Sequence, residues 1–318
     1  GLAAHYARRR CAKLALSKAP RALHAPGMAW QCSADTHVGL IHNLERAGII
    51  RSPAVRRAML ATDRARYAPP VPPERRKCAT YNYGPYADAP QAIGHKATIS
   101  APHIHAAALE VLAGHLATPG CRALDVGCGS GYMTACMARM ASPRASVAAV
   151  ERIQPLAELT AANLAQDGLP CLEEGGWSRE GPPAAGEPPD TAHAAPRIVV
   201  RCADGWAGAV EFAPFRAIYV GAAAPEVPGA LVAQLAPGGR LLVPVGGRER
   251  QALTVVDKAA DGTVRQWEVG VARFVPLVRE PAAAGRAPAQ AQEGEGGPGP
   301  GQVDYDERYR RGWAYGKE

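Results

Sequence analysis

Short apolar runs alternate with amphipathic segments along the middle of the chain. The apolar runs are typical of strands buried in a parallel sheet, and we predict five of them: Ala123–Val126, Ala145–Val150, Arg197–Cys202, Ala217–Val220 and Arg240–Val245. The amphipathic segments predict helices: one capped by Ser33, Asp35 or Thr36 that ends near Ala47, then Ser52 to about Asp63, His103–Leu116, Tyr132–Met140, Pro155–Gln166 and Pro228–Leu235. Strands that alternate with helices predict an α/β fold with a doubly wound sheet.

The pattern changes after the fifth strand. Ala252–Asp257 and Thr263–Val269 are apolar runs on either side of Asp261-Gly262, a pair typical of a type I′ hairpin turn. Arg273–Leu277 could form a last strand. We therefore predict a mostly parallel sheet with an antiparallel C-terminal hairpin, and a ligand at the C-terminal ends of the parallel strands.

Four regions differ in composition from this core. Residues 1–27 are basic, rich in Ala and free of acidic residues; they predict a disordered leader, with a mitochondrial-type presequence as the alternative. Residues 68–85 and 170–196 predict loop insertions, the second of them disordered, and residues 279–318 predict a low-complexity tail. The folded domain would span residues 28–278.

The positive charge is concentrated at the start of the chain. The sequence has 36 Lys and Arg against 29 Asp and Glu, and residues 1–30 hold six of the basic residues and none of the acidic ones. The remaining 30 basic and 29 acidic residues leave a net charge of +1, which indicates no surface for nucleic acid. No apolar run approaches the roughly 18 residues of a membrane span.

The eight cysteines are scattered along the chain. None belongs to a C-x-x-C pair, so no zinc site is predicted. We expect reduced intracellular thiols rather than a disulfide framework.

The candidate chemistry lies at a glycine turn. Ala123–Gly131 reads ALDVGCGSG, and its G-x-G-x-G spacing, with Asp125 two positions before Gly127, resembles motif I of S-adenosylmethionine-dependent methyltransferases. Glycine has no Cβ, so the backbone can approach a nucleotide-like ligand closely; a tight turn without a ligand is the alternative. Glu151, at the tip of the second strand, is placed to bind ribose hydroxyls, unless it is a solvent-facing carboxylate.

Two further segments are candidates for ligand contact. Asp204, at the end of the third strand, could accept from an adenine amino group or form an Asp-Gly turn. Tyr86–His105 has neither helical nor alternating periodicity but is dense in Gly, Pro, Ser, Thr and His. It predicts a loop, either a plain connection or a binding loop beside the active site.

Several stretches together resemble the protein-L-isoaspartate (D-aspartate) O-methyltransferase family, in particular its animal cytosolic type. The T-I-S-x-P-H loop and the GAAAP segment are the most specific of these. The stretches read MAWQ at Met28–Gln31, LIHNLERAGII at Leu40–Ile50, MLATDR at Met59–Arg64, YADAPQAIGHKATISAPHIHA at Tyr86–Ala106, LDVGCGSG at Leu124–Gly131, VGAAAPEVP at Val220–Pro228 and LAPGGRLLVPVG at Leu235–Gly246. The resemblance implies a Rossmann-like methyltransferase fold in a monomeric, cytosolic enzyme.

The implied reaction transfers a methyl group from S-adenosyl-L-methionine to the free carboxylate of an L-isoaspartyl or D-aspartyl residue in damaged proteins and peptides, with S-adenosyl-L-homocysteine as product. A carboxylate is ionised at pH 7, so its attack needs no general base. The site must align the nucleophile with the methyl group and desolvate the carboxylate. The methyl ester then closes to a succinimide, whose hydrolysis returns some normal aspartate, so the implied role is protein repair.

The resemblance also implies the site residues. Ser100 would be the active-site residue, with a hydroxyl that orients the substrate carboxylate; a helix N-cap is the alternative. The cofactor would lie against Ala97, Thr98, Ile99, Ser100 and His105, with its methionine half at Asp125, Gly127 and Gly129, its ribose at Glu151 and Arg152, and its adenine at Asp204 and Gly205. No metal is implied. His103 and His105 could instead be surface histidines at the helix start.

One departure from the family and two other functions are weighed against this interpretation. Val278 stands where the family commonly has a threonine, which puts contacts from the last strand in doubt. The alternatives are another carboxyl or small-molecule methyltransferase and a non-catalytic cofactor-binding adaptor. An amino-group DNA methyltransferase would carry [DN]-P-P-[YFW] after the fourth strand, where this chain has GAAAP.

Overall fold

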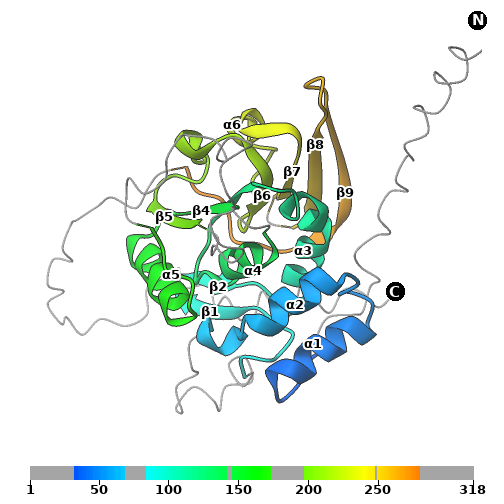
Figure 1. Ribbon diagram of the computed structural model, residues 1–318, viewed down its shortest axis with the longest axis vertical. Helices are drawn as coiled ribbons and strands as arrows, with labels where there is room; N and C mark the ends of the chain where they lie inside the picture. Colours follow the sequence, from blue (N-terminus) through cyan, green and yellow to red (C-terminus); the bar gives the residue numbers. More distant parts are fainter. Residues whose placement is uncertain (1–31, 69–83, 142–144, 173–196, 248, 280–318) are drawn as a thin grey trace, which may run out of the picture.

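A seven-stranded sheet with helices on both faces forms the body of the protein (Figure 1). The computed structural model describes residues 32–68, 84–141, 145–172, 197–247 and 249–279. The strands of the sheet, in spatial order, are β5 (Arg197–Cys202), β4 (Ser146–Glu151), β3 (Arg122–Val126), β6 (Phe215–Val220), β7 (Leu235–Gly246), β8 (Gln251–Lys258) and β9 (Val264–Ala272). The helices are α1 (His37–Arg46), α2 (Pro53–Ala61), α3 (Pro102–Leu116), α4 (Tyr132–Met140), α5 (Gln154–Gln166) and α6 (Gly229–Ala233), with 3-10 turns η1 (Arg64–Arg66) and η3 (Val210–Phe212).

The strand directions confirm the predicted fold class. β3 pairs in parallel with β4 and β6, and the parallel pairing extends to β5 on one side and β7 on the other. β8 then pairs antiparallel with β7, and β9 pairs antiparallel with β8. Because parallel strands end at one edge, the turns after β3, β4, β5 and β6 gather there.

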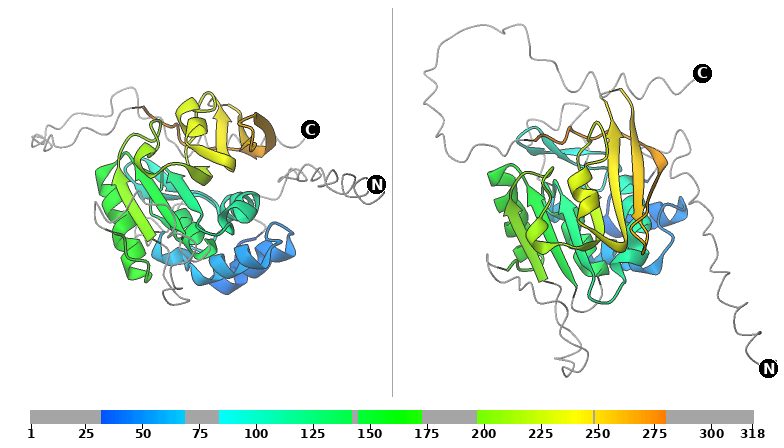
Figure 2. Two further views of the ribbon diagram at one scale, coloured as in Figure 1. Left: turned by 45° about the horizontal axis from the view of Figure 1, so that its top comes forward. Right: turned by 90° about the horizontal axis from the view of Figure 1, so that it is seen from above.

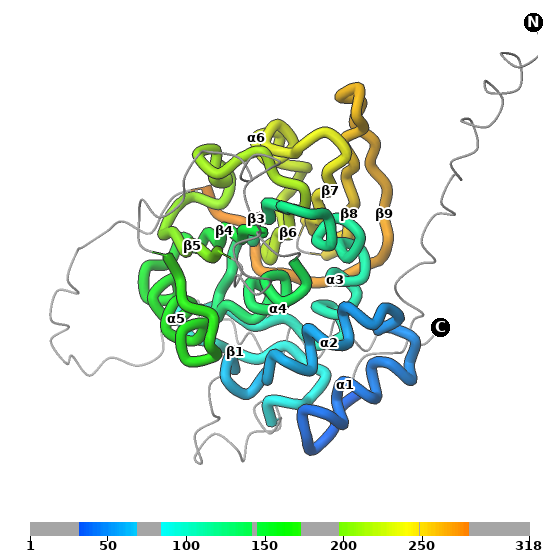
Figure 3. The backbone as a smooth tube through the Cα atoms, in the orientation of Figure 1, coloured from blue at the N-terminus to red at the C-terminus, as the bar shows by residue number. Residues whose placement is uncertain are grey.

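The helices divide between the two faces of the sheet (Figure 2). α3, α4 and α5 cover one face, and α1 and α2 form an outer layer against α3 and α4. On the other face η3 and α6 pack against a second apolar cluster. The course of the chain in Figure 3 shows why the sheet is doubly wound: the connections β3–α4–β4 and β4–α5–β5 run on the first face, and those through η3 and α6 on the second.

Local sequence signals explain where the first two helices begin and end. Thr36 caps α1 by accepting from the backbone N–H of Gly39, and Gly48 ends the helix with a positive φ of 71°. Ser52 caps α2, and Pro53 occupies the first helical position, where no intrahelical N–H is needed. Both predicted helices are confirmed, although α2 ends two residues before Asp63.

The loop predicted for Tyr86–His105 is wrong in its middle. Residues Gln91–Gly94 (β1) and Ala97–Ile99 (β2) form an antiparallel hairpin. Its turn residues His95 and Lys96 both have positive φ, 51° and 59°, as a type I′ turn requires. Asn-Gly and Asp-Gly are the usual residues there, so the sequence carried no hairpin signal.

The structure of the C-terminal third differs from the sequence-based predictions in three further places. α6 is shorter than predicted because Leu235 already pairs with Phe215 in the sheet. The β8–β9 turn is not type I′, since in Asp261-Gly262 only the glycine has a positive φ; a β-turn closed by Gly262 N–H to Ala259 O forms the hairpin instead. The predicted strand Arg273–Leu277 is reduced to an isolated bridge from Pro276 to Ala223.

Some of the expectations concern residues outside the described ranges. These are the leader 1–27 and MAWQ, almost all of the 68–85 and 170–196 insertions, and the tail after residue 279. The six cysteines that the structure describes are free thiols. No helix in the described ranges has the length and apolarity needed to cross a membrane.

Burial in the second apolar cluster makes the C-terminal strands sensitive to truncation of side chains. Val256 in β8 is fully buried, whereas Val264 at the start of β9 is 45% exposed. We expect Val256→Ala to lower the free energy of unfolding by about 2 kcal/mol through lost burial and a cavity, and Val264→Ala to change it by less than about 0.5 kcal/mol. Urea denaturation measures both, and equal losses would contradict the described packing of β8.

Candidate active site

The glycine turn after β3 has an unusual backbone. Gly127, Gly129 and Gly131 have φ values of 76°, 60° and 91°, a region that residues with a Cβ rarely adopt. Gly131 is also the N-cap of α4. The turn therefore passes from strand to helix with no side chain at three of its five positions, which confirms the predicted strand–turn–helix geometry.

Neighbouring elements hold this turn in place. The N–H groups of Gly127 and Cys128 both donate to the carbonyl of Val150 at the end of β4, at 2.7 and 3.2 Å. From α5, the Thr160 hydroxyl donates to the carbonyl of Gly129, and the Asn163 amide donates to the carbonyl of Ser130, both at 2.9 Å. α5 was predicted only as a helix, and nothing in its sequence pattern marked these two side chains.

Glu151 links the glycine turn after β3 with the residues that follow β4. Its side chain is 6% exposed, so the solvent-facing alternative is wrong. One carboxylate oxygen accepts from the N–H of Gly129 and the other from that of Ile153, each at 3.1 Å. A carboxylate oxygen can accept a second hydrogen bond, so both oxygens keep capacity for a ligand. Arg152 follows Glu151 and is partly buried.

Asp125 lies beneath the turn and is fully buried. Oδ2 accepts a 2.6 Å hydrogen bond from the Thr134 hydroxyl on α4, and Oδ1 has no hydrogen-bond partner in the protein. Burial raises the pKa of Asp125 to about 7; the Thr134 hydrogen bond opposes this rise and the nearby Glu151 charge adds to it. A buried acceptor oxygen without a partner suits a positively charged donor.

A turn at Asp204 and Gly205 follows β5. The Asp204 carboxylate accepts from the N–H of Trp206 at 2.9 Å, so the Asp-Gly turn is formed; its contact with an adenine stays a prediction. Gly205 lies so close to other residues that a Cβ would be 2.7 Å from Val126 Cγ1 and 3.1 Å from Leu277 Cδ1. Only glycine fits there.

The residues after β9 cross the edge of the sheet at this point. Ala223 donates to the carbonyl of Val275 at 2.8 Å and accepts from the N–H of Leu277 at 2.7 Å. The Trp206 indole donates to the carbonyl of Leu277 at 3.0 Å, and the Arg279 guanidinium stacks 4.1 Å from its ring. We call residues 273–279 the C-terminal strap. Val278 within it is 40% exposed.

The β1–β2 hairpin covers the glycine turn. Ile93 of β1 places its Cδ1 3.0 Å from the point where a Cβ on Gly129 would lie. β2 carries the predicted contacts Ala97, Thr98 and Ile99, of which Thr98 is exposed and Ile99 buried. Ser100 is half-buried between β2 and α3. The structure thus brings the TIS segment and the glycine turn together from separate parts of the sequence.

Asp88 closes the base of this hairpin segment. It is 1% exposed, and its Oδ1 accepts from the backbone N–H of His103 at 3.0 Å and contacts His103 Nδ1 at 2.7 Å. Asp88 therefore caps α3 from a distance. Ala101 is the N-cap residue of α3 and makes no side-chain cap, so the alternative reading of Ser100 as the N-cap is wrong.

His103 and His105 are both buried, at 4% and 5% exposure, which excludes the surface alternative. The His105 ring packs against Tyr132 with centroids 4.9 Å apart. Burial, then the charge of Arg64, holds the pKa of His105 well below its usual value. Arg64 is itself fully buried and donates to the carbonyl of Ala89 at 3.2 Å. Arg64, His103 and His105 thus form a buried polar cluster that packs against the hairpin segment.

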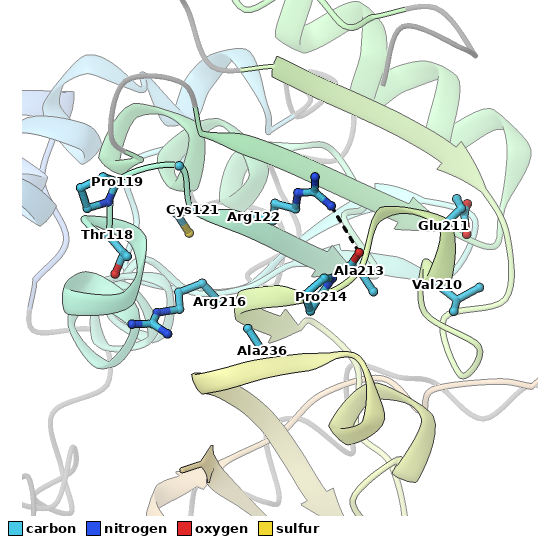
Figure 4. A pocket seen from close by; sticks show the side chains of 11 residues that line it. Thr118, Pro119, Cys121, Arg122, Val210, Glu211, Ala213, Pro214, Arg216 and Ala236 are labelled. Atoms are coloured by element: carbon cyan, nitrogen blue, oxygen red, sulfur yellow. Dashed lines mark hydrogen bonds between the residues drawn. The ribbon is translucent and has the colours of Figure 1, made fainter. Parts of the chain in front are cut away.

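A separate cavity of about 660 Å³ lies at the other end of the sheet (Figure 4). It is bounded by the residues before β3 and β6, and Arg122 donates across it to the carbonyl of Ala213 at 3.3 Å. The predicted site residues line none of it. Because ligands of doubly wound sheets bind at the carboxyl ends of the strands, the glycine turn remains the candidate site.

Comparisons with known proteins agree on one family. The family model described as protein-L-isoaspartate(D-aspartate) O-methyltransferase matches residues 35–282. The chain is 39% identical to protein-L-isoaspartate O-methyltransferase 1 of Arabidopsis thaliana over 79% of its own length and 94% of the relative, and 38% identical to the Caenorhabditis elegans protein-L-isoaspartate O-methyltransferase over 79% and 96%. A Plasmodium falciparum structure of a protein-L-isoaspartate O-methyltransferase with S-adenosyl-L-homocysteine has a TM-score of 0.60 and 31% identity, covering 77% of this chain and 99% of that one.

The raised pKa of Asp125 makes ligand binding depend on pH. In the free protein the Asp125 carboxyl keeps its proton up to about pH 7. If the ammonium group of S-adenosyl-L-homocysteine binds beside this carboxyl, its positive charge favours the ionised form and lowers the pKa of Asp125. We expect the affinity for S-adenosyl-L-homocysteine to rise between about pH 5 and pH 7, with release of up to about one proton. Calorimetric titrations in two buffers of different ionisation enthalpy measure the release. Asp125→Asn is the matched control, and equal proton release in both proteins would refute the assignment.

The contact of Asp88 with His103 stabilises the base of the hairpin segment. We expect Asp88→Ala to lower the free energy of unfolding by about 1–3 kcal/mol, because the α3 cap and the contact of Asp88 with His103 Nδ1 are both lost. Asp88→Asn keeps an oxygen that accepts from the His103 N–H and recovers part of the loss. Urea denaturation gives the energies, and hydrogen exchange shows whether Ile99–His105 exchange faster in Asp88→Ala. Indistinguishable Ala and Asn variants would argue against the cap.

Proposed function

The chain belongs to the protein-L-isoaspartate(D-aspartate) O-methyltransferase family, and from this premise we propose how its own residues carry out the family's reaction. The enzyme methylates the carboxylate of isoaspartyl residues in proteins, with S-adenosyl-L-methionine as the donor. The observation that carries our assignment of the site is the glycine turn above buried Asp125, covered by the TIS hairpin.

The residues around the glycine turn fit this cofactor. Asp125 Oδ1 is a buried acceptor without a partner, which suits the ammonium of a methionine group. The Glu151 oxygens each accept one backbone N–H and can each accept from a ribose hydroxyl. Gly127 and Gly129 present backbone without side chains. When bound, the cofactor supplies a methyl group on a positively charged sulfur, from which it leaves readily.

We assign the remaining contacts on the same grounds. Arg152 and Glu151 would lie at the ribose, and Asp204 and Gly205 at the adenine, since the first pair stands at the end of β4 and the second follows the neighbouring strand β5. Ala97, Thr98, Ile99 and Ser100 would close the pocket from the hairpin side, with His105 behind them against Tyr132. The Val278 position would make no hydroxyl contact.

Ser100 would orient the substrate. Its hydroxyl donates to an oxygen of the isoaspartyl carboxylate, and the other oxygen is then free to attack the methyl group in line with its bond to sulfur. The attacking group is already an anion, so the site has no proton to remove. Buried Ile99 and Ala101 flank Ser100 and exclude water from the carboxylate.

The product explains the repair role. Transfer forms one oxygen–carbon bond and breaks one sulfur–carbon bond, leaving a methyl ester and S-adenosyl-L-homocysteine. The neighbouring backbone nitrogen then attacks the ester carbonyl and expels methanol, which gives a succinimide. Water opens this ring on either side, so part of the product is normal aspartate.

We further propose that the enzyme acts as a monomer in the cytosol, on isoaspartyl proteins and peptides and without nucleic acid or membrane as partner. The near-neutral charge of residues 31–318, 30 basic against 29 acidic, supports the lack of a nucleic-acid surface. Size-exclusion chromatography with light scattering tests the monomer.

A non-catalytic adaptor is the second candidate function that the family name alone does not exclude. Asp125 and Glu151 do not separate the two functions, because a cofactor-binding adaptor would use them as well. The retention of Ser100 on the hairpin segment beside the glycine turn, where a substrate carboxylate would lie, favours an active enzyme.

The reaction is tested with labelled S-adenosyl-L-methionine and two peptides that differ only in an isoaspartyl or aspartyl residue. We expect label in the isoaspartyl peptide alone. Glu151→Gln would lower transfer about 10-fold or more by weakening the binding of the donor S-adenosyl-L-methionine, because the amide nitrogen of the new side chain would face a backbone N–H. Glu158→Gln, at an exposed position of α5, is the matched control with unchanged transfer. No label in either peptide, with S-adenosyl-L-homocysteine still bound, would favour the adaptor.

A further inference from the structure

The hydroxyl group of Tyr219 is buried without a hydrogen-bond partner. Tyr219 precedes the last residue of β6 and is 2% exposed, and its phenolic oxygen makes no hydrogen bond of good geometry within the described protein, although the Ser100 hydroxyl lies near it. Buried hydroxyl groups nearly always have a partner, and each exception calls for a ligand, water or strain. The sequence gives no motif for this residue, which lies one position before the VGAAAP stretch.

Three contacts place this hydroxyl at the candidate active site. Tyr219 is the register partner of Asp125 on the neighbouring strand, so the two side chains lie next to each other on the same face of the sheet. Its ring edge lies 3.5 Å from the point where a Cβ on Gly221 would lie, and the same point is 2.9 Å from the carbonyl oxygen of Gly127. The Ser100 side chain is close enough to affect the acidity of the phenol.

The surroundings decide which ligand group suits the hydroxyl. Burial, and then the charge of Asp125, raises the pKa of Tyr219, so the phenol stays protonated and can donate. Asp125 Oδ1, the unpartnered acceptor next to it, suits a positively charged group. The phenol is therefore left as the donor for an anion, and Ser100 brings a second hydroxyl to the same place.

We propose that Tyr219 binds the substrate: its O–H donates to the isoaspartyl carboxylate beside Ser100. The inference rests on the proposed function. Two hydroxyl donors from different elements, the β2–α3 junction and β6, fix the rotation of the carboxylate, whereas one donor leaves it free to turn. The carboxylate is then held with one oxygen toward the methyl group before the reaction begins.

Tyr219→Phe tests this, because it removes one oxygen and keeps the ring packing. We expect kcat/KM for an isoaspartyl peptide to fall about 10-fold. The dissociation constant of S-adenosyl-L-homocysteine should not change, and the Tm should not fall, since the lost hydroxyl makes no hydrogen bond of good geometry in the described protein. An unchanged kcat/KM overturns the inference, and so does a loss of S-adenosyl-L-homocysteine affinity that accounts for the fall.

Tyr67→Phe is the matched control. Tyr67 is equally buried, but its hydroxyl donates to Asp167 at 2.6 Å and is therefore already occupied within the protein. This variant should lower the Tm and leave kcat/KM near that of the wild type, the reverse of Tyr219→Phe. If both variants lower kcat/KM equally, the effect is structural and the inference fails.

The same experiment separates this inference from the proposed function. Wild-type protein that labels the isoaspartyl peptide, together with Tyr219→Phe at the same rate, refutes only the role of Tyr219. Wild-type protein that labels neither peptide refutes the proposed function and the inference with it.

Discussion

The arrangement of the site depends on one constraint: a backbone turn with three left-handed glycines must be held rigidly without side chains of its own. Its neighbours supply the support. Val150 binds two of its N–H groups, Glu151 binds a third, and Thr160 and Asn163 hold its carbonyls. All of these residues belong to the second β–α unit. The second unit thus fixes the shape of a turn that belongs to the first, which is why the order of strands at the centre of the sheet matters for this turn.

The parallel part of the fold could be predicted because its signals are local. β5 and α4 match the predicted bounds, and β3 and β4 differ from them by one residue at one or both ends, since apolar runs of four to six residues between helical segments have few other solutions. The β1–β2 hairpin could not be predicted in the same way. His95 and Lys96 adopt a backbone conformation that their residue types disfavour, and the covering of Gly129 by Ile93 compensates for this only in the assembled protein.

The residues of the candidate site also fall into those that local sequence signals predict and those that depend on contacts between elements. Glu151 and the glycines are found from spacing because one strand and its turn bring them together. Asp88, Thr134 and Tyr219 could not be found so, because each is placed by contacts between different elements. Asp88 contacts His103 at the start of α3, Thr134 of α4 donates to Asp125 of β3, and Tyr219 of β6 lies in register with Asp125. The resemblance to a family pointed to the segment that contains Asp88 but not to what the carboxylate does there.

The C-terminal strap has a consequence for how the protein is made. Every strand of the sheet precedes the strap in the chain, so a nascent polypeptide can pair β3 with β4 and β6 while the strap is still inside the ribosome. Trp206 and Ala223 acquire their partners only after Leu277 has emerged. The edge of the sheet beside Gly205 is therefore among the last parts of the described protein to be completed during translation, and a chain released too early would carry the sheet without the contacts of the strap to Trp206 and Ala223.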